Sequence, residues 1–317
     1  MPKELSPSDT EAIATMKAKL SKLETPEGRL RGFDLKPGNA NDVIIASPPK
    51  CGTTWMQQIV HTLRSGGSME FDEISCVIPC LEMGWDCGID PQAPQSYSPA
   101  AYKTHFSWPF CPSGCKKIFV IRDPEDVGPS FYHFFNGWYF EANTISMGSF
   151  LKEFFLRRGE PSSWEENASV WFHITSWYPH RKDEDVLWLH FEDLKEYLPQ
   201  CVALIAEFIG CGVDNPKLQE LAVKQASFEF MSQNSEKYDE HPLKLARNVA
   251  CGLPEQAGME GNKKVRQGKV GTGKELDAEM KAEFEQKWKD SVEAGLGFSS
   301  YSEMRASINA ELQRPWI

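Results

Sequence analysis

The sequence predicts an α/β fold, with a central and mostly parallel β-sheet flanked by helices. Three short apolar runs, residues 43–46, 117–122 and 186–190, suit strands that are buried on both faces. Each run is followed by polar residues and then by a stretch with helical periodicity. Strands that alternate with helices in this way form parallel sheets, and we expect one domain over residues 1–317.

Residues 1–40 form a lead-in to this sheet. A helix is expected from Ser8 to Leu23, followed by a Pro/Gly-marked loop through residues 37–39. The first 32 residues contain no apolar run, and no stretch of about 18 apolar residues occurs anywhere. We therefore expect a cytoplasmic protein without a secretion signal, a membrane span or a membrane partner.

Further helices are expected over residues 53–64, 161–180 and 199–232. Residues 234–273 are polar, rich in Gly and Lys and without periodicity, which predicts a mobile loop that contacts substrate or cofactor. Residues 274–317 return to helix, with large apolar side chains at four-residue intervals from Leu276 to Trp288.

Composition excludes some classes of partner. The formal net charge is −11, whereas surfaces that bind DNA or RNA need Lys and Arg in excess, so no nucleic-acid partner is expected. The nine Cys include two CxxxC pairs, Cys76/Cys80 and Cys111/Cys115, which could hold a metal or a redox bridge. No further Cys or His lies at zinc-finger spacing from these pairs, so we favour reduced thiols over a metal site.

The loop that follows the first strand carries residues suited to binding an anion. It leaves a buried strand and opens a helix, whose unpaired N–H groups and dipole attract phosphate-like groups. Lys50 adds a positive charge, and Thr53 and Thr54 add hydroxyl donors. The spacing is not that of the nucleotide-kinase loop G-x-x-x-x-G-K-[ST], and a simple turn with two capping threonines is the alternative.

The seven residues from Pro49 to Trp55 resemble the 5′-phosphosulfate loop of the cytosolic sulfotransferases, which use 3′-phosphoadenosine 5′-phosphosulfate (PAPS). The resemblance implies that Lys50, Cys51, Gly52, Thr53, Thr54 and Trp55 bind this donor. Cys51 stands where the family usually has Ser, so one hydroxyl is lost while the backbone N–H remains.

Arg122 and Ser130 are similar to the family's site for the 3′-phosphate. Arg grips a phosphate with two N–H groups, and a Ser hydroxyl donates to the same group. Taken alone, Arg122 followed by Asp123 could instead be a salt bridge at a helix cap.

The segment from Tyr102 to Phe106 resembles the family segment that contains the catalytic base, which implies that His105 takes the acceptor's proton. Lys103 and Lys50 would then neutralise charge on the transferring sulfuryl group. Without Lys103 beside it in this segment, a histidine such as His105 would more often be a surface residue or a core residue whose hydrogen bonds are satisfied.

Two later segments resemble the rest of the nucleotide site. Ser227 and Phe228 match the adenine-side stretch, where Phe228 and Trp55 would hold the purine between them. Phe191 stands where Tyr is frequent. The C-terminal phosphate loop corresponds to Arg266, Gln267 and Gly268, with Gln267 in place of Lys.

The resemblance implies a sulfotransferase that passes a sulfuryl group in line from PAPS to a hydroxyl or amine of a small-molecule acceptor, releasing adenosine 3′,5′-bisphosphate without a metal. One alternative is a Mg-dependent P-loop kinase or NTPase, which needs an acidic residue at a strand end such as Asp123 or Asp193. Another is a non-catalytic relative that only binds the nucleotide. The sequence names neither the acceptor nor the oligomeric state.

Overall fold

The computed structural model describes residues 7–259, 268 and 270–316. Within this part of the chain a single sheet is formed by β1 (Val43–Ala46), β2 (Ala101–Thr104), β3 (Lys116–Ile121) and β4 (Val186–His190). All neighbouring strands are parallel, in the order β2-β1-β3-β4. The predicted α/β fold with a central parallel sheet is confirmed.

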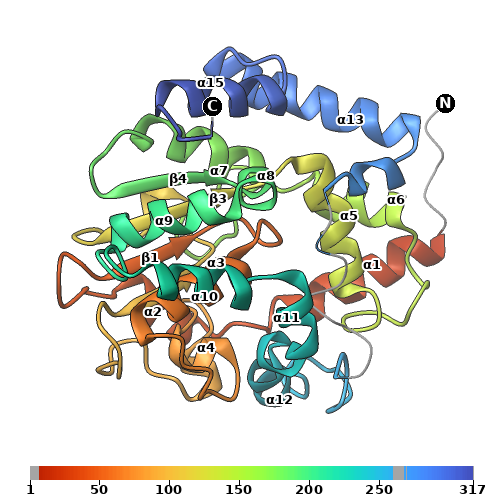
Figure 1. Ribbon diagram of the computed structural model, residues 1–317. Helices are drawn as coiled ribbons and strands as arrows, with labels where there is room; N and C mark the ends of the chain where they lie inside the picture. Colours follow the sequence, from red (N-terminus) through yellow and green to blue (C-terminus); the bar gives the residue numbers. More distant parts are fainter. Residues whose placement is uncertain (1–6, 260–267, 269, 317) are drawn as a thin grey trace.

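Helices lie on both faces of this sheet (Figure 1). They are α1 (Pro7–Leu20), α2 (Pro26–Phe33), α3 (Thr53–Ser65), α4 (Ile74–Val77), α5 (Pro124–Phe135), α6 (Met147–Phe150), α7 (Val170–Trp177), α8 (Phe191–Glu196), α9 (Leu198–Ile209), α10 (Pro216–Gln225), α11 (Phe228–Gln233), α12 (His241–Arg247), α13 (Ala278–Trp288), α14 (Ala294–Leu296) and α15 (Tyr301–Glu311).

The sheet separates the two larger apolar clusters of the core. In β1, Val43 and Ile45 face one cluster with α3, α9 and α10, whereas Ile44 and Ala46 face the other with α5, α7, α13 and α15. Successive side chains of a strand point to opposite faces of a sheet, so a strand buried on both faces must be apolar throughout. This requirement explains why the three apolar runs predicted their strands so closely.

Strand β2 was not predicted as a strand. Its four residues include Lys103 and Thr104, and a polar pair inside so short a run gives no apolar signal. Both are nevertheless buried, because Lys103 forms an ion pair with Glu240 and Thr104 donates a hydrogen bond to Glu82. Partners distant in sequence therefore let a polar segment occupy an edge of the sheet.

Several helical expectations need correction. Residues 161–169 are not helical, since α7 begins only at Val170, where Ser169 caps its first turn. The stretch 199–232 is divided into α9, α10 and α11. Residues 234–273 are not a loop throughout, because they contain a 3₁₀ turn at Ser235–Tyr238 and the helix α12. Helix α2, which lies in the expected lead-in, was also missed.

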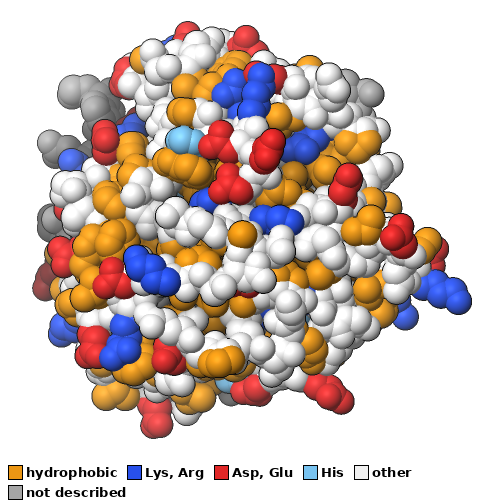
Figure 2. Space-filling view, turned by 90° about the vertical axis from the view of Figure 1, so that its left-hand side faces the viewer, with side chains coloured by type: hydrophobic (Ala, Val, Ile, Leu, Met, Phe, Trp, Pro, Cys, Tyr) orange, Lys and Arg blue, Asp and Glu red, His pale blue; other side chains and the backbone are white. Residues whose placement is uncertain are grey.

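The C-terminal helices agree with the predicted periodicity. Leu276, Met280, Phe284 and Trp288 are all buried, and the last three lie on α13. On the face of the molecule shown in Figure 2, acidic, basic and apolar side chains are interspersed. Among the described residues, none of the helices has the length and apolarity that crossing a membrane requires.

Candidate active site

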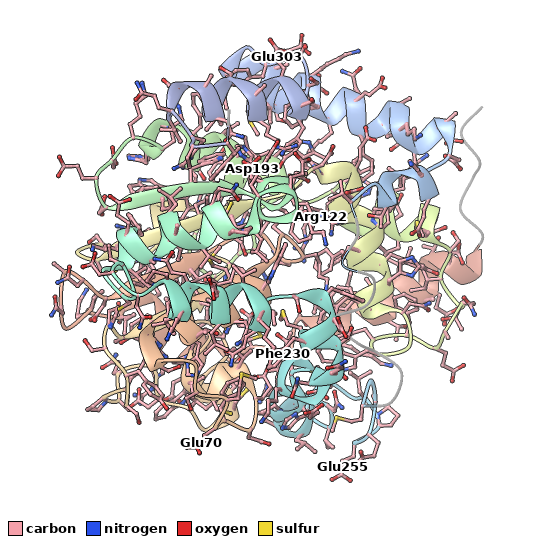
Figure 3. All side chains as sticks on the ribbon, in the orientation of Figure 1. Glu70, Arg122, Asp193, Phe230, Glu255 and Glu303 are labelled. Atoms are coloured by element: carbon pink, nitrogen blue, oxygen red, sulfur yellow. The ribbon has the colours of Figure 1, made fainter. Side chains whose placement is uncertain are left out.

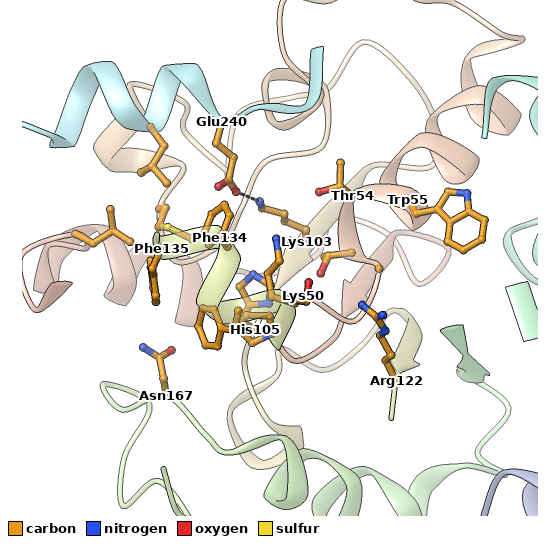
Figure 4. Close-up of a pocket in the computed structure, with 18 of the residues that line it drawn as sticks. Lys50, Thr54, Trp55, Lys103, His105, Arg122, Phe134, Phe135, Asn167 and Glu240 are labelled. Carbon is orange, nitrogen blue, oxygen red and sulfur yellow. Dashed lines mark hydrogen bonds and ion pairs between the residues drawn. The ribbon is translucent and has the colours of Figure 1, made fainter. Parts of the chain in front are cut away.

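A cavity of about 520 Å³ lies at the carboxyl edge of the sheet. Each strand leads into a residue that lines it: Lys50 follows β1, His105 follows β2, Arg122 follows β3 and Phe191 follows β4. The carboxyl ends of parallel strands meet at one edge of the sheet, so these residues come together although they are far apart in sequence. In Figure 4, Lys50 and His105 lie centrally, with Arg122 to one side.

The loop between β1 and α3 turns sharply at two residues in the left-handed region. Lys50 has φ 72° and Gly52 has φ 102°. A Cβ on residue 52 would lie 2.9 Å from Cδ2 of Phe191, so this position needs glycine. Gly52 is the N-cap of α3, whose first N–H groups and dipole favour an anion. Lys50, Gly52, Thr53 and Thr54 all line the cavity, as the anion site requires.

Cys51 is the member of this loop whose side chain does not line the cavity. It is fully buried in the core cluster, and burial raises the pKa of its thiol. A side chain in this place contacts core residues instead of a ligand. The change from Ser to Cys therefore alters packing beneath the loop and leaves its backbone in place.

Arg122 and Ser130 line the cavity from the end of β3 and from α5. Nη2 of Arg122 lies 3.3 Å from Oδ2 of Asp126 and 3.5 Å from Oγ1 of Thr272. Asp126 also accepts hydrogen bonds from the backbone N–H groups of Gly271 (2.8 Å) and Gly273 (2.7 Å). One carboxylate therefore orients Arg122 and fixes residues 271–273 beside it.

The structure places some, but not all, of the residues predicted to hold the adenine at the wall of the cavity. Trp55, Phe191 and Phe228 line the cavity, and Nε1 of Trp55 donates to the carbonyl oxygen of Ala226 at 2.7 Å. The rings of Trp55 and Phe191 meet edge to face at 5.3 Å, whereas Phe228 is 42% exposed. Ser227 is not among the lining residues; its hydroxyl caps α11.

Only one residue of the predicted C-terminal phosphate loop falls within the described part of the chain. Gly268 lines the cavity next to Phe228, where a Cβ on residue 268 would approach that ring to 2.5 Å. Arg266 and Gln267 lie outside the described residues.

His105 is held in one orientation by the strand ends around it. Its Nδ1 lies 2.8 Å from the carbonyl oxygen of Ser47, and its backbone N–H donates to Oε1 of Glu82 at 2.5 Å. Because a carbonyl only accepts, Nδ1 carries the proton and Nε2 is the basic nitrogen. The hydroxyls of Ser47 and Thr53 are 2.5 Å apart, so the same residue contacts both the imidazole and the anion loop.

Lys103 lines the cavity, but its ammonium group is engaged by the protein itself. Nζ lies 3.1 Å from Oε1 of Glu240, and the two side chains are 2% and 9% exposed (Figure 4). Burial, the largest single cause, would lower the pKa of Lys103, but the negative groups around it, led by Glu240, together raise it. Lys103 is therefore charged and bound to the residue that precedes α12, a partner that the sequence did not reveal.

Most of the far side of the cavity was missed by sequence reasoning. It is lined by residues of the α1–α2 connection and of α2, by the segment before α7 and by aromatic side chains of α5: Glu24, Arg29, Phe131, Phe134, Phe135, Arg158, Trp164 and Asn167. Arg29 forms an ion pair with Glu24 and donates to the carbonyl oxygens of Trp164 (2.6 Å) and Glu166 (3.1 Å). These contacts join segments about 135 residues apart, and a local sequence pattern does not predict contacts over such a separation.

The two acidic residues at strand ends have structural partners. Asp123 caps α5, its Oδ1 accepting from the N–H of Glu125 at 3.0 Å, so the salt bridge of Arg122 is with Asp126 and not with Asp123. Burial would raise the pKa of Asp193, but hydrogen bonds from His190 and Asn309 and the charge of Arg305 hold it below its ordinary value.

Neither Asp123 nor Asp193 is among the described residues that line the cavity, and Figure 3 shows Asp193 beneath the C-terminal helices. Nor do three His, Cys, Asp or Glu residues of the described ranges gather as metal ligands would. These positions do not supply the acidic metal ligand that a kinase or NTPase needs at a strand end.

Comparison with known proteins gives one consistent result. A sulfotransferase domain model matches residues 40–295. Sulfotransferase 1B1 from Canis lupus familiaris is 31% identical over 206 residues, which cover 61% of this chain and 67% of that protein. The sulfotransferase 1B1 of Mus musculus is 28% identical over 218 residues, covering 65% and 69%.

Solved structures share the fold. Retinol dehydratase, described in complex with androsterone and the inactive cofactor PAP, superposes with a TM-score of 0.64 at 21% identity over 92% of this chain and 96% of its own. Mouse sulfotransferase SULT7A1, described as complexed with PAP, superposes with a TM-score of 0.61 at 21% identity over 92% and 95%.

The domain match covers all four strands and the cavity residues that follow them. The sulfotransferases 1B1, which are more similar in sequence than the solved structures, agree with this match. This chain therefore belongs to the sulfotransferase family.

Proposed function

We propose that this protein transfers a sulfuryl group from PAPS to a hydroxyl or amine of a small-molecule acceptor and releases adenosine 3′,5′-bisphosphate (PAP). One observation carries the proposal: the loop of residues 50–54, Arg122, Ser130 and His105 line a single cavity. Membership of the sulfotransferase family and the two structural neighbours described with PAP support it.

The donor half of the cavity offers two separate cationic positions for a molecule with two anionic ends. The loop with Lys50 and the N-terminus of α3 suits the phosphosulfate, and Arg122 with Ser130 suits the 3′-phosphate. Glycine at position 52 lets the loop adopt a positive φ and pack closely against Phe191. When bound, PAPS supplies the electrophilic sulfur and a stable leaving group.

His105 suits the role of general base. Its Nδ1–H is directed to Ser47, so Nε2 accepts the proton that the acceptor loses. Lys50, in the same cavity, stabilises negative charge that develops on the transferring group. For Lys103 to share this task it must leave Glu240, and we therefore assign the charge stabilisation first to Lys50.

The acceptor half suits an apolar molecule, because Phe131, Phe134, Phe135 and Trp138 line it. Structural neighbours described with androsterone and with retinol agree with this class of acceptor. The nine cysteines, all within the described ranges, are free thiols, which fits a reducing compartment. We therefore expect the reaction to take place in the cytoplasm.

Calorimetric titration with PAP in EDTA tests the donor site. We expect tight binding without Mg²⁺, and Arg122→Gln should weaken it about 10- to 100-fold because a charge-assisted pair of hydrogen bonds is lost. Arg157→Gln, at a surface arginine paired with Glu153, is the matched control and should bind PAP normally. Tight binding of Mg-ATP with no binding of PAP would contradict the proposal and favour a kinase or NTPase.

A further inference from the structure

Arg158 brings an uncompensated positive charge to the acceptor half of the cavity. It lines the cavity, and its guanidinium lies 4.9 Å from the ring centroid of Phe131 and 4.7 Å from that of Phe154. Burial lowers its pKa to about 10, which still leaves it charged at neutral pH. Among the described residues, its side chain forms neither a hydrogen bond nor an ion pair, and the guanidinium lies over these two rings.

The acidic residues nearby do not neutralise this charge. Among residues 7–259, 268 and 270–316, Glu24 is the carboxylate that affects the pKa of Arg158, and Glu24 is itself the ion-pair partner of Arg29. Glu240, further along the lining, is paired with Lys103. Arg158 is half-buried, and a charge partly withdrawn from water without an ionic partner is unfavourable, so an anion from a ligand would be favoured here.

The position of Arg158 relates it to the reacting centre. Phe131 and Phe134 are one turn apart on α5, about 4.5 Å along the helix axis. Arg158 lies over Phe131, and Nζ of Lys50 lies 4.1 Å from the ring centroid of Phe134. Along α5, Lys50 of the donor loop therefore lies at the ring of Phe134, and Arg158 lies one turn earlier at the ring of Phe131.

His105 and Arg158 both affect the buried His173. The pKa of the buried His173 is lowered to about 3, first by burial and then by the charges of His105 and Arg158, so both act on the same imidazole. Asn167 adds a neutral donor on this side, because its Oδ1 accepts from Arg29 at 3.4 Å and its amide nitrogen remains to donate. In Figure 4, Asn167 lies across His105 from Arg122 and Trp55.

We propose that Arg158 is a specificity-determining residue that binds a carboxylate on the acceptor, so that this enzyme prefers apolar phenols or alcohols that carry a carboxylate at the end opposite the reacting hydroxyl. The aromatic rings of α5 bind the apolar body, His105 faces the hydroxyl and the guanidinium of Arg158 binds the carboxylate with two N–H groups. This inference rests on the proposed sulfuryl transfer and names its acceptor class.

Two matched phenols test it: 3-(4-hydroxyphenyl)propionate and its methyl ester, assayed with PAPS by mass spectrometry of the sulfated product. We expect wild-type protein to favour the carboxylate by at least about tenfold in kcat/KM, and Arg158→Gln to lower that value about 10- to 100-fold while leaving the ester within about twofold. Arg157→Gln, its exposed neighbour, should leave both values unchanged. Equal losses for the two phenols in Arg158→Gln, or no preference in the wild type, would overturn the proposal.

A second measurement needs no turnover, and its main comparison uses only the wild-type protein. In the presence of PAP, 3-phenylpropionate should bind wild-type protein at least about tenfold more tightly than 3-phenylpropanamide, because only the carboxylate is charged. Equal affinity would overturn the proposal. Preferred binding of the carboxylate, abolished in Arg158→Gln, without sulfation of any phenol would leave the anion site standing and contradict the proposed function instead.

Discussion

The orientation of one imidazole determines what the cavity can do chemically. His105 donates from Nδ1 to the backbone of Ser47, which leaves Nε2 as the basic nitrogen. The motif around His105 predicted the residue, but its tautomer depends on a carbonyl oxygen 58 residues earlier. A contact of that kind becomes visible only when β1 and β2 are paired.

His105→Ala should lower the turnover number at least about a hundredfold, the size expected when a general base is lost. PAP affinity should stay nearly unchanged, because the donor is bound by other residues. The two effects are measured by steady-state kinetics and by calorimetry. His180→Ala, at a half-buried histidine outside the cavity, is the control, and equal turnover in both variants would remove His105 from the mechanism.

The buried pair of Lys103 and Glu240 shows what a motif does not reveal. The sequence predicted a lysine that contacts the sulfuryl group, whereas the structure pairs it with a residue 137 positions later. Removing one member of a buried ion pair leaves an uncompensated charge and costs about 3–5 kcal/mol, whereas replacing both costs less.

Lys103→Met and Glu240→Leu should therefore each lower the free energy of unfolding, and the double variant should lose clearly less than the sum of the two. Urea unfolding at pH 7 measures the free energy of unfolding of the wild type, the two single variants and the double variant. Strict additivity would show that the two side chains do not interact in solution.

Elements buried on both sides were the most predictable part of the fold. Strands β1, β3 and β4 are apolar because both of their faces meet core, and their residues alone indicated them. Strand β2 was missed because the polar Lys103 is buried against Glu240, a partner far away in the sequence. Local patterns cannot report such long-range compensation.

The N-cap of α5 should make stability depend on pH. Burial raises the pKa of Asp123 from 3.8 to about 7, so the folded protein binds this proton more tightly than the unfolded chain does. The stabilising contribution is therefore present below pH 4 and is lost as the pH rises through about 7.

Asp123→Asn keeps the cap but removes this titration. Its Tm should match that of the wild type near pH 4 and exceed it by about 5 °C at pH 8. Differential scanning fluorimetry across this range measures the difference, with Asp277→Asn at the cap of α13 as the control. A constant difference at every pH would show that Asp123 titrates normally.

At the scale of the whole molecule, the two halves of the cavity differ in how far sequence could predict them. The donor half follows directly from strand ends, so Lys50, Arg122 and His105 were found from motifs. The acceptor half is assembled from α1, α2, α5 and the segments around Arg158 and Asn167. Its residues carry no motif and meet only through tertiary packing, so the acceptor chemistry had to be inferred from the structure.

Transfer of label from ³⁵S-PAPS to a phenol in the presence of EDTA tests the central claim most directly. Wild-type protein should produce one labelled phenyl sulfate for each PAP released, and His105→Ala should produce at least about a hundredfold less in the same time. If PAP and PAPS bind but no labelled product forms with phenols, alcohols or amines, the chain is a nucleotide-binding relative and not a sulfotransferase enzyme.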